Sequence, residues 1–491
     1  MASLSDKAGV LIAANFVKYA VGFAMPMVLV RMLTKHDYGT LQQLQLIGAT
    51  AAGALVLGLP NSVYYFHRLD DDHSRTALVQ QTLALLALSG LITWLALTLG
   101  ARPLSEWMNN AELLRYLPLF ALSVGLSIAD EHFLHFMIAR NRFLTAAAFD
   151  TGETIVRVLA LLIPLLAGYG LQGLVLSVVA LALTRALVRN ALLLNSIGWK
   201  LHPRPGSLFV REQLAYSIPL FLTSLTGLLG GALDRMIISI NFTPTLYAIY
   251  TVGALQIPLD TIFQIPIANV LRASMPELVR AGQLPEVVHL IREAARKLSI
   301  IMLPSFIFLL GFSEEFITLL FTANYRASVP VFQIYIWLLP MNMFVLSPIP
   351  QAFGRTKAIL YIVFIGTSVQ VAASFALLKW IGYLGPAIAM VVCSNLIVLA
   401  YMYLGIQLLQ TTARKLIPFK EIAAALTAAL IALLSTRFLV GGPGMTVAGM
   451  ALAAVLYAAV FVAVALPLRV FAEQDLDLVR RWLAQLGFGR Q

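Results

Sequence analysis

Long apolar stretches, separated by short polar segments, recur from one end of the chain to the other. An α-helix of about 20 apolar residues is long enough to cross the hydrocarbon core of a bilayer. The pattern therefore predicts an all-α polytopic membrane protein with about fourteen transmembrane helices. The expected spans are residues 8–31, 40–66, 77–100, 117–139, 144–168, 170–194, 213–240, 245–271, 297–321, 328–353, 358–379, 383–408, 421–440 and 446–470.

The composition supports this interpretation and narrows the class of function. Of the 491 residues, 60% are hydrophobic and 12% are charged, whereas a soluble domain is about 25% charged. The loops between the expected spans are too short for an extramembrane catalytic domain or nucleotide-binding fold. Cys393 is the sole cysteine, which excludes a disulfide and a cysteine-based metal cluster. We therefore expect a function carried out within the bilayer, without enzyme activity, a bound metal or an organic cofactor.

The distribution of basic residues predicts the orientation of the chain. Most of the 34 Lys and Arg residues fall in segments on the same side as the N-terminus, including Arg185 and Arg189. Because basic residues resist translocation, this side is expected to be cytoplasmic, and both termini should lie there. The net charge of +11 is then a signal of membrane topology, and no nucleic-acid partner is needed to explain it.

Short motifs return at near-equal separations along the chain. LTKHDYGTL at residues 33–41 resembles FTPTLYAIY at 242–250, with Thr34, Tyr38 and Gly39 aligned to Thr243, Tyr247 and Ala248. ARNR and GLQG, which begin at residues 139 and 170, are followed at similar offsets by AFGR and GYLG, which begin at 352 and 382. Three such matches across six spans favour duplication of a six-helix unit.

An even number of spans gives both copies the same polarity in the membrane, so we expect two lobes related by a pseudo-two-fold axis along the membrane normal. The cleft expected between two such lobes is typical of alternating-access transporters. The last two spans would form an additional helix pair, followed by an amphipathic tail at the cytoplasmic face. The expected parts are an N-lobe at 1–195, a C-lobe at 213–408, the hairpin at 421–470 and the tail at 471–491.

Several of these segments also resemble a known family. VRMLTKHDYGTLQQ, LDRMIISINFTPTLYAIY, AFGRTK and the stretch from MPELVRAG to ASVPVFQI are similar to the polysaccharide-transporter branch of the multidrug/oligosaccharidyl-lipid/polysaccharide (MOP) exporter superfamily. The resemblance implies a MATE-like fold and a flippase in the bacterial inner membrane. Its substrate would be undecaprenyl-pyrophosphate-linked oligosaccharide, moved to the periplasmic leaflet for surface polysaccharide or exopolysaccharide synthesis. Polymerase and chain-length proteins of such a pathway are the implied partners, besides the lipid bilayer.

Nine of the ionisable side chains inside the expected spans, histidines excluded, are candidates for a functional site. Each costs about 3 kcal/mol at the centre of a bilayer, so the set must face water or one another. Asp150, Glu153 and Arg157 have the spacing of a shared helix face, and the last two have the i, i+4 spacing of an ion pair. The other six are Lys18, Asp130, Glu131, Asp234, Arg235 and Asp260.

These charges suit a hydrated central cavity that accepts a phosphorylated headgroup. Lys18 and Arg157 lie far from either interface and are the candidates for contact with the anionic group of the substrate. Arg235 is a candidate for contact at a later stage, and Gln370 occupies the position equivalent to Arg157 in the second repeat. A structural ion pair between helices is the alternative for each basic residue.

The carboxylates are candidates for coupling to H⁺ or Na⁺, because a desolvated acid binds a cation in one conformation and releases it in another. Asp130, Glu131 and Glu153 are best placed for coupling. Asp150, Asp234 and Asp260 are candidates for coupling or for pairing with the basic residues.

Three other functions compete with this hypothesis. A multidrug exporter of the same superfamily is expected to have an acid in its first span, where this chain has Lys18. A lipid II flippase is closer in chemistry, although the loops resemble the polysaccharide branch better. A polysaccharide polymerase or ligase resembles proteins with one large periplasmic loop, which the short outer loops here disfavour.

Overall fold

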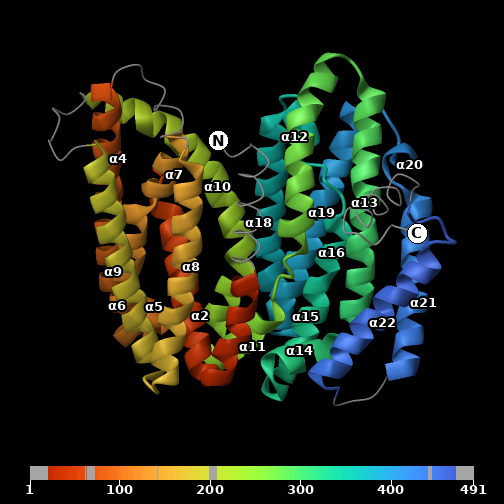
Figure 1. The fold of residues 1–491 in the computed structure, drawn as a ribbon, viewed down its shortest axis with the longest axis horizontal. Coiled ribbons are helices and arrows are strands. Elements are labelled where there is room, and N and C mark those ends of the chain that lie inside the picture. The colour runs from red at the N-terminus through yellow and green to blue at the C-terminus, as the bar shows by residue number, and fades with distance from the viewer. Residues whose placement is uncertain are drawn as a thin grey trace, which may run out of the picture. The chain divides into compact units, whose positions relative to one another are not determined.

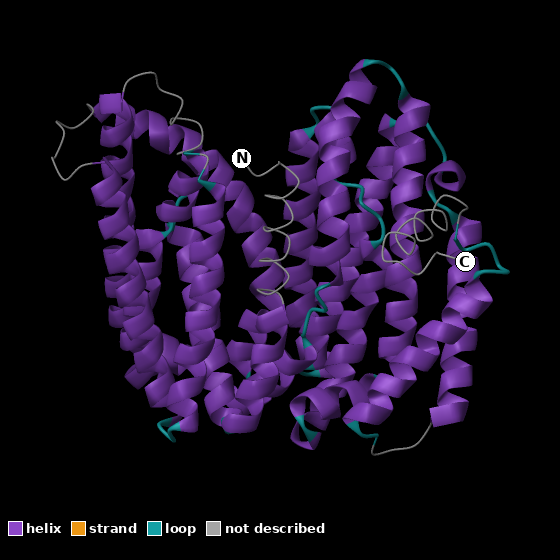
Figure 2. Cartoon of the chain, in the orientation of Figure 1, coloured by secondary structure: helices purple, strands orange, loops and turns teal. Residues whose placement is uncertain are grey.

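A computed structural model describes residues 20–60, 62, 72–140, 142–197, 207–440 and 445–471 of the chain. Every regular element in these ranges is helical (Figure 2). The candidate residue Lys18 and nearly all of the predicted tail at 471–491 lie outside them. Eight helices in the described ranges are long and apolar enough to cross a membrane, so the all-α membrane fold is confirmed. They are Thr76–Leu99, Glu112–Ala139, Gly170–Ser196, Leu284–Gly311, Thr356–Ile381, Leu384–Leu408, Phe419–Val440 and Val447–Ala465.

The chain forms two compact units, Met1–Thr251 and Val252–Gln491. In unit 1, α6 packs against α4 and α9, α9 also packs against α8, and α10 packs against α2 (Figure 1). The helices of this unit are α2 (Lys35–Leu55), α4 (Asp72–Leu99), α5 (Ala101–Trp107), α6 (Glu112–Asp130), α7 (His132–Ala139), α8 (Phe143–Leu166), α9 (Gly170–Ile197), α10 (Ser207–Asn241) and α11 (Pro244–Gly253), which crosses the boundary.

The repeated motifs mark equivalent helix starts. Thr34 Oγ1 accepts a hydrogen bond from the Asp37 N–H at 3.1 Å and so caps α2. Thr243 Oγ1 likewise faces the Leu246 N–H, at 3.4 Å, at the start of α11. The tyrosines that follow both threonines are buried. The motif similarity therefore has a physical basis, while the six-helix repeat and the predicted lobe boundaries stay predictions.

Close helix packing in unit 1 depends on glycine. A Cβ atom added to Gly90 of α4 would overlap the carbonyl oxygen of Gly125 in α6, and a Cβ on Gly125 would overlap that of Gly90. Backbone atoms cannot move aside as a flexible side chain can, so the two helices would have to separate. Small residues that let helix backbones approach closely are typical of packing within membranes.

Gly90→Ala should therefore lower the free energy of unfolding by about 1–3 kcal/mol, the usual cost of overpacking. Gly152→Ala is the matched control, because no atom lies within 4 Å of the Cβ position at that helical glycine. Thermal unfolding of the purified variants measures the difference. Equal melting temperatures for the two alanine variants would contradict the close packing of α4 on α6.

In unit 2, α18 packs against α19, and α13 packs against α21, which also contacts α22 (Figure 1). Arg437 of α21 donates to Glu315 Oε1 at 2.5 Å and lies 4.1 Å from the Phe312 ring centroid. These contacts fix the C-terminal helix pair to its own unit. The helices are η1 (Asp260–Gln264), α12 (Ile265–Arg280), α13 (Leu284–Gly311), α14 (Ser313–Phe321), η2 (Ala323–Ser328), α15 (Val329–Tyr335), η3 (Ile336–Leu338), α16 (Leu339–Asn342), α17 (Pro348–Ala352), α18 (Thr356–Ile381), α19 (Leu384–Leu408), α20 (Ala413–Leu416), α21 (Phe419–Val440) and α22 (Val447–Ala465).

Two of the predicted spans are not continuous helices. Residues 254–258 interrupt the span predicted at 245–271, and residues 343–347 interrupt the span predicted at 328–353. Pro258 lies at the end of the first interruption and Pro348 directly after the second. Proline lacks a backbone N–H and disfavours a helical conformation in the residue before it. Continuous hydropathy concealed both breaks, because their residues are also largely apolar.

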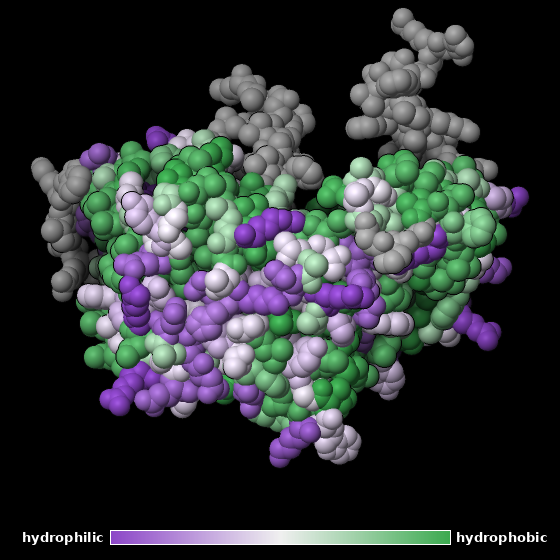
Figure 3. All heavy atoms as spheres, turned by 90° about the horizontal axis from the view of Figure 1, so that it is seen from below, coloured by the Kyte–Doolittle hydropathy of each residue, from purple (hydrophilic) through white to green (hydrophobic). Residues whose placement is uncertain are grey.

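Hydrophilic side chains gather on one face of the molecule. Figure 3 views the molecule from below, and hydrophilic side chains gather in a band on this face, with hydrophobic side chains at its margins. This distribution is expected where apolar helices reach the surface of a bilayer, because loops need water or polar partners for their backbone groups.

Candidate functional site

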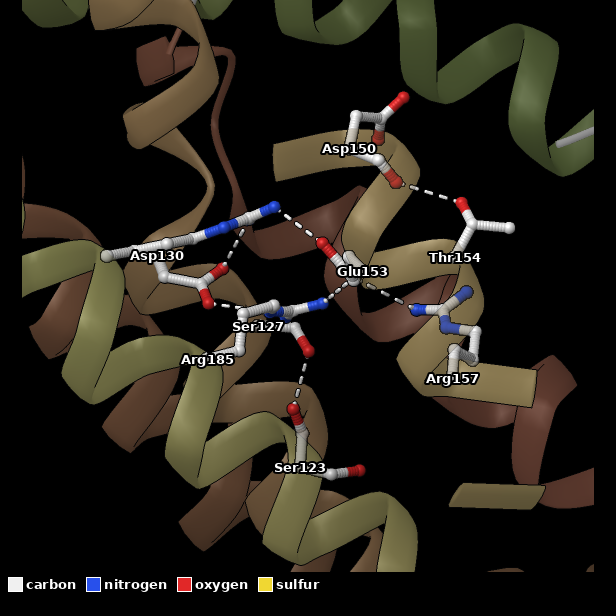
Figure 4. Close-up of polar contacts among 9 residues, drawn as sticks. Ser123, Ser127, Asp130, Asp150, Glu153, Thr154, Arg157 and Arg185 are labelled. Atoms are coloured by element: carbon white, nitrogen blue, oxygen red, sulfur yellow. Dashed lines mark hydrogen bonds and ion pairs between the residues drawn. The ribbon is translucent and has the colours of Figure 1, made fainter. Parts of the chain in front are cut away.

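Three of the ionisable residues predicted in unit 1, Asp130, Glu153 and Arg157, meet where α6, α8 and α9 pack together (Figure 4). Asp130 is the last residue of α6, and Glu153 and Arg157 lie one turn apart on α8. Arg185 and Arg189 lie one turn apart on α9. Three helices therefore bring five charged side chains to one place.

Two acids and two arginines form a closed ion network. Arg185 Nε donates to Asp130 Oδ2 at 2.7 Å, and its Nη1 donates to Glu153 Oε1 at 2.6 Å. Arg189 donates to Glu153 Oε2 at 2.5 Å and to Asp130 Oδ1 at 3.4 Å. Each guanidinium bridges both carboxylates, a geometry that its planar fork permits and a lysine would not reproduce.

This network is shielded from solvent, which makes its charge balance important. The side chains of Asp130 and Arg189 are 0% and 5% exposed. Removing one partner of a buried ion pair leaves an uncompensated charge and costs about 3–5 kcal/mol. The four-residue network therefore fastens the C-terminal end of α6 to the interior turns of α8 and α9.

Arg157 is the exposed member of the cluster. Its Nη2 lies 3.7 Å from Glu153 Oε1, which confirms the ion pair predicted from the i, i+4 spacing, and its side chain is 61% exposed. A charge-assisted hydrogen bond would be nearer 2.8 Å, and Glu153 is already held by two closer arginines. Three arginines face two carboxylates, so the cluster carries one excess positive charge, on its most accessible side chain.

An open cavity of about 440 Å³ lies between α8 and α9 beside this cluster. Its walls include Glu153, Arg185 and Arg189, together with apolar side chains such as Val156 and Leu181. The cavity thus combines a wall of paired charges with an apolar groove, and the excess positive charge on Arg157 lies one helical turn from Glu153, outside the lining residues. Such a combination can bind an amphiphile that has an anionic group.

The other predicted site residues lie apart from this cluster. Asp150 is half-buried on α8, where its backbone carbonyl oxygen accepts a hydrogen bond from the Thr154 hydroxyl (Figure 4). Glu131 is exposed at the junction of α6 and α7. Asp234 of α10 is buried and accepts a hydrogen bond from Tyr250 Oη at 2.7 Å.

Arg235, next to Asp234 on α10, is half-buried. In unit 2, Gln370 of α18 is buried, and Asp260 accepts a hydrogen bond from Asn342. Gln370 therefore differs in environment from the exposed Arg157, with which the sequence repeat aligns it. The transport roles of these residues stay predictions.

The sequence analysis counted Arg185 and Arg189 among the basic residues of the cytoplasmic side and gave them no role in the site. The structure places both on α9, within the candidate span Gly170–Ser196. Their spacing could have indicated a role in the site. Two arginines four residues apart within an apolar stretch share one helix face and can pair with the same acids. Their positions near one end of the span suggested an interface, but the acids on α6 and α8 hold them inside the helix bundle.

Comparison with known proteins identifies the fold. A family model described as "Polysaccharide biosynthesis protein" matches residues 28–330. No curated protein matches the chain. The structure is similar to a lipid II flippase MurJ in an inward closed conformation, with a TM-score of 0.69, 12% identity and coverage of 92% of this chain and 97% of the other.

It is also similar to the inward-facing conformation of a multidrug resistance MATE family transporter of the MOP superfamily, with a TM-score of 0.65, 12% identity and coverage of 80% of this chain and 94% of the other. A third similar structure is a MOP superfamily transporter from Pyrococcus furiosus, with a TM-score of 0.55, 13% identity and coverage of 83% and 96%. At these identities the likeness shows a shared fold. The predicted MATE-like architecture is therefore confirmed at the level of fold class.

Proposed function

Because the chain belongs to the polysaccharide biosynthesis protein family, we propose that it is a flippase. Its proposed substrate is undecaprenyl-pyrophosphate-linked oligosaccharide. It moves these units from the cytoplasmic to the periplasmic leaflet of a bacterial inner membrane by alternating access, with both termini in the cytoplasm. The resemblance of the motifs to the polysaccharide-transporter branch and the MOP fold support the class of transport.

The exposed Arg157 is the observation that supports an anionic lipid-linked substrate. Its side chain is 61% exposed and lies more than two turns from either end of α8. An arginine at this depth is strongly disfavoured against acyl chains, so its exposed guanidinium requires water or an anion. A pyrophosphate offers the oxygens that a guanidinium binds in bidentate fashion.

The groove beside Arg157 suits the rest of such a substrate. Its charged side chains are compatible with an anionic headgroup, and its apolar side chains are compatible with a polyprenyl chain. Lys18 and Arg235 are proposed to contact the anionic group at other stages, and Gln370 to contact sugar hydroxyls. Transport by this route needs no covalent step, so the protein acts without enzyme activity and hands its substrate to polymerase and chain-length proteins.

A lipid II flippase is the second candidate, because the MurJ structure covers 92% of this chain. Both substrates place an anionic group on a lipid, so the site favours neither by charge. The two functions differ in what the cell loses. Loss of a lipid II flippase stops cell-wall synthesis, whereas loss of an oligosaccharide flippase removes a surface polymer and leaves the wall intact.

Deletion of the gene in a host with a defined surface polysaccharide tests the proposed function. We expect the polymer to disappear and lipid-linked repeat units to accumulate in the inner leaflet, with growth and cell-wall synthesis unchanged. Protease-free spheroplasts probed with a lectin report the leaflet. Lipid-linked units that already lie in the outer leaflet, with polymer missing, would contradict a flippase and favour a polymerase or ligase.

A further inference from the structure

A histidine and two acids converge where the first turns of α2 and α6 meet. His36 and Asp37 lie in the first turn of α2, and Glu112 is the first residue of α6. One nitrogen or oxygen atom from each of the three side chains lies within 4.8 Å of the other two. These residues are separate from the charged cluster at Arg157, and the proposed transport function gives them no role.

Buried hydrogen bonds hold the two helix starts together. Asn110, which is 2% exposed, donates to Thr40 Oγ1 at 2.9 Å and to Gln43 Oε1 at 2.6 Å, both on α2. The Asn110 Oδ1 atom accepts a hydrogen bond from the Glu112 N–H at 3.1 Å. The fold therefore fixes the backbone of Glu112 relative to α2 before any ligand binds, and such preorganisation favours binding.

The two carboxylates lie close together without a basic partner. Asp37 Oδ2 accepts a hydrogen bond from the Thr34 hydroxyl at 2.7 Å, and among the residues that the structure describes neither acid forms a salt bridge. Glu112 Oε2 is shielded from solvent and has no hydrogen-bond partner there. Arg115, one turn further along α6, donates to Gln172 at 2.6 Å instead.

Two like charges at this separation repel each other, so the pair favours a bound cation. Both acids lie at helix N-termini, where the helix dipole stabilises a negative charge by about 0.3–1 kcal/mol. This effect makes each acid tolerable, but it does not explain why two helices bring their acids together beside an imidazole. The shielded Glu112 Oε2 lacks the partner that a buried carboxylate oxygen needs.

The set of donor atoms suits a divalent transition-metal ion. Carboxylate oxygens bind hard cations such as Mg²⁺ and Ca²⁺, whereas an imidazole nitrogen favours Zn²⁺ and the transition metals near it. Two carboxylates balance the charge of a divalent ion, and a neutral imidazole adds a ligand without adding charge. Zn–N and Zn–O bonds of about 2.0–2.2 Å place the ligands of a tetrahedral ion about 3.4 Å apart. Side-chain rotation can close the present separations, because none of the three residues is buried.

We propose that His36, Asp37 and Glu112 form a binding site for a divalent transition-metal ion of the Zn²⁺ class. The two acids neutralise the ion, and His36 provides the preference over Mg²⁺ and Ca²⁺. Thr34 orients the Asp37 carboxylate and Asn110 anchors Glu112, as hydrogen-bond partners of metal ligands commonly do. The bound ion ties α2 to α6. On the predicted topology both helix starts lie on the side opposite the N-terminus, so the ion arrives from the periplasm.

This site departs from the expectation of no bound metal, which rested on the single cysteine. Its donors come from two segments distant in sequence, and neither segment alone has the spacing of a metal motif. Metal binding is independent of the proposed flippase function and is measured without substrate.

Thermal unfolding and isothermal titration calorimetry of the purified full-length protein in detergent test the site. The protein is produced without a polyhistidine tag and stripped of metal with EDTA. With Zn²⁺ the melting temperature of the wild type should rise and saturate at one ion per chain, because a ligand that binds the folded state stabilises it. Mg²⁺ and Ca²⁺ should give no such response. His36→Ala and Glu112→Gln should each lower the Zn²⁺ affinity by roughly tenfold or more.

His289→Ala is the matched control, because His289 lies 3.8 Å from Glu293 in another surface pair of a histidine and an acid. It should keep the wild-type affinity. Loss of affinity in His36→Ala and Glu112→Gln, with affinity kept in His289→Ala, supports the site. No saturable Zn²⁺ response in the wild type, an equal response to Mg²⁺ or Ca²⁺, equal loss in His289→Ala, or unchanged affinity in either site variant overturns it. If Glu112→Gln does not fold, His36→Ala decides alone, because its side chain is not buried.

Discussion

An Arg189→Leu variant should accumulate far less folded protein than the wild type. Arg189 is 5% exposed and pairs with both Asp130 and Glu153, so its loss leaves Asp130 with Arg185 alone and Glu153 with Arg185 and the looser Arg157. Breaking a buried ion pair costs about 3–5 kcal/mol, a large part of the roughly 5–15 kcal/mol that stabilises a folded protein. Fluorescence-detected size-exclusion chromatography of solubilised membranes measures the folded fraction.

A compensating change provides the control for this prediction. The double variant Arg189→Leu/Asp130→Leu removes one charge of each sign and leaves the Arg185–Glu153 pair, which is 2.6 Å long. It should fold better than Arg189→Leu alone, because non-additivity is expected for residues of one charge network. A double variant that folds worse than the Arg189 single variant would contradict electrostatic coupling in the cluster.

An Arg157→Ala variant should behave in the opposite way, with normal folding and impaired transport. The side chain is 61% exposed and only loosely paired at 3.7 Å, so its removal leaves no buried acid without a partner. Hydrogen bonds to charged groups contribute about 1.5–3 kcal/mol, which corresponds to a loss of roughly 10- to 150-fold in transport rate. The measurement is the rate at which lipid-linked repeat units leave the inner leaflet of a deletion strain that carries the variant.

Arg157→Lys and Arg102→Ala serve as controls for the transport effect. Lysine keeps the charge but loses the bidentate fork, so its rate should fall between those of alanine and the wild type. Arg102 is exposed at the start of α5 and pairs locally with Glu106 at 3.3 Å, and its replacement should leave transport unchanged. Equal loss at both arginines would indicate a general effect of surface charge and would remove Arg157 from the mechanism.

Local spacing predicted the contacts within single helices. The Arg157–Glu153 pair follows from two residues four apart on α8, and the structure places the groups 3.7 Å from each other. The cap at Thr34, whose hydroxyl accepts a hydrogen bond from the Asp37 N–H, is also a local contact, although the sequence analysis interpreted this motif only as part of a repeat. In both cases the partners are fixed by helix geometry alone, which a sequence displays directly.

Contacts between helices could not be predicted in the same way. Asp130 binds Arg185, 55 residues away, and no period in the sequence specifies which faces of α6 and α9 meet. Hydropathy also treated 245–271 as one span, although η1 and α12 follow an interruption there. Apolar composition measures affinity for lipid and contains little information on whether a helix is continuous. Pro258 was the residue in the sequence that could have indicated the break.

The central claim is that an anionic lipid-linked headgroup passes the exposed Arg157. Proteoliposomes with the purified full-length protein and undecaprenyl-pyrophosphate-linked oligosaccharide test it most directly, with lectin access reporting the leaflet that each headgroup occupies. The account predicts headgroup exchange between leaflets with the wild type, at least tenfold slower exchange with Arg157→Ala, and none in protein-free vesicles. Exchange by Arg157→Ala at the wild-type rate, or no exchange by the wild type beyond that of protein-free vesicles, would contradict it.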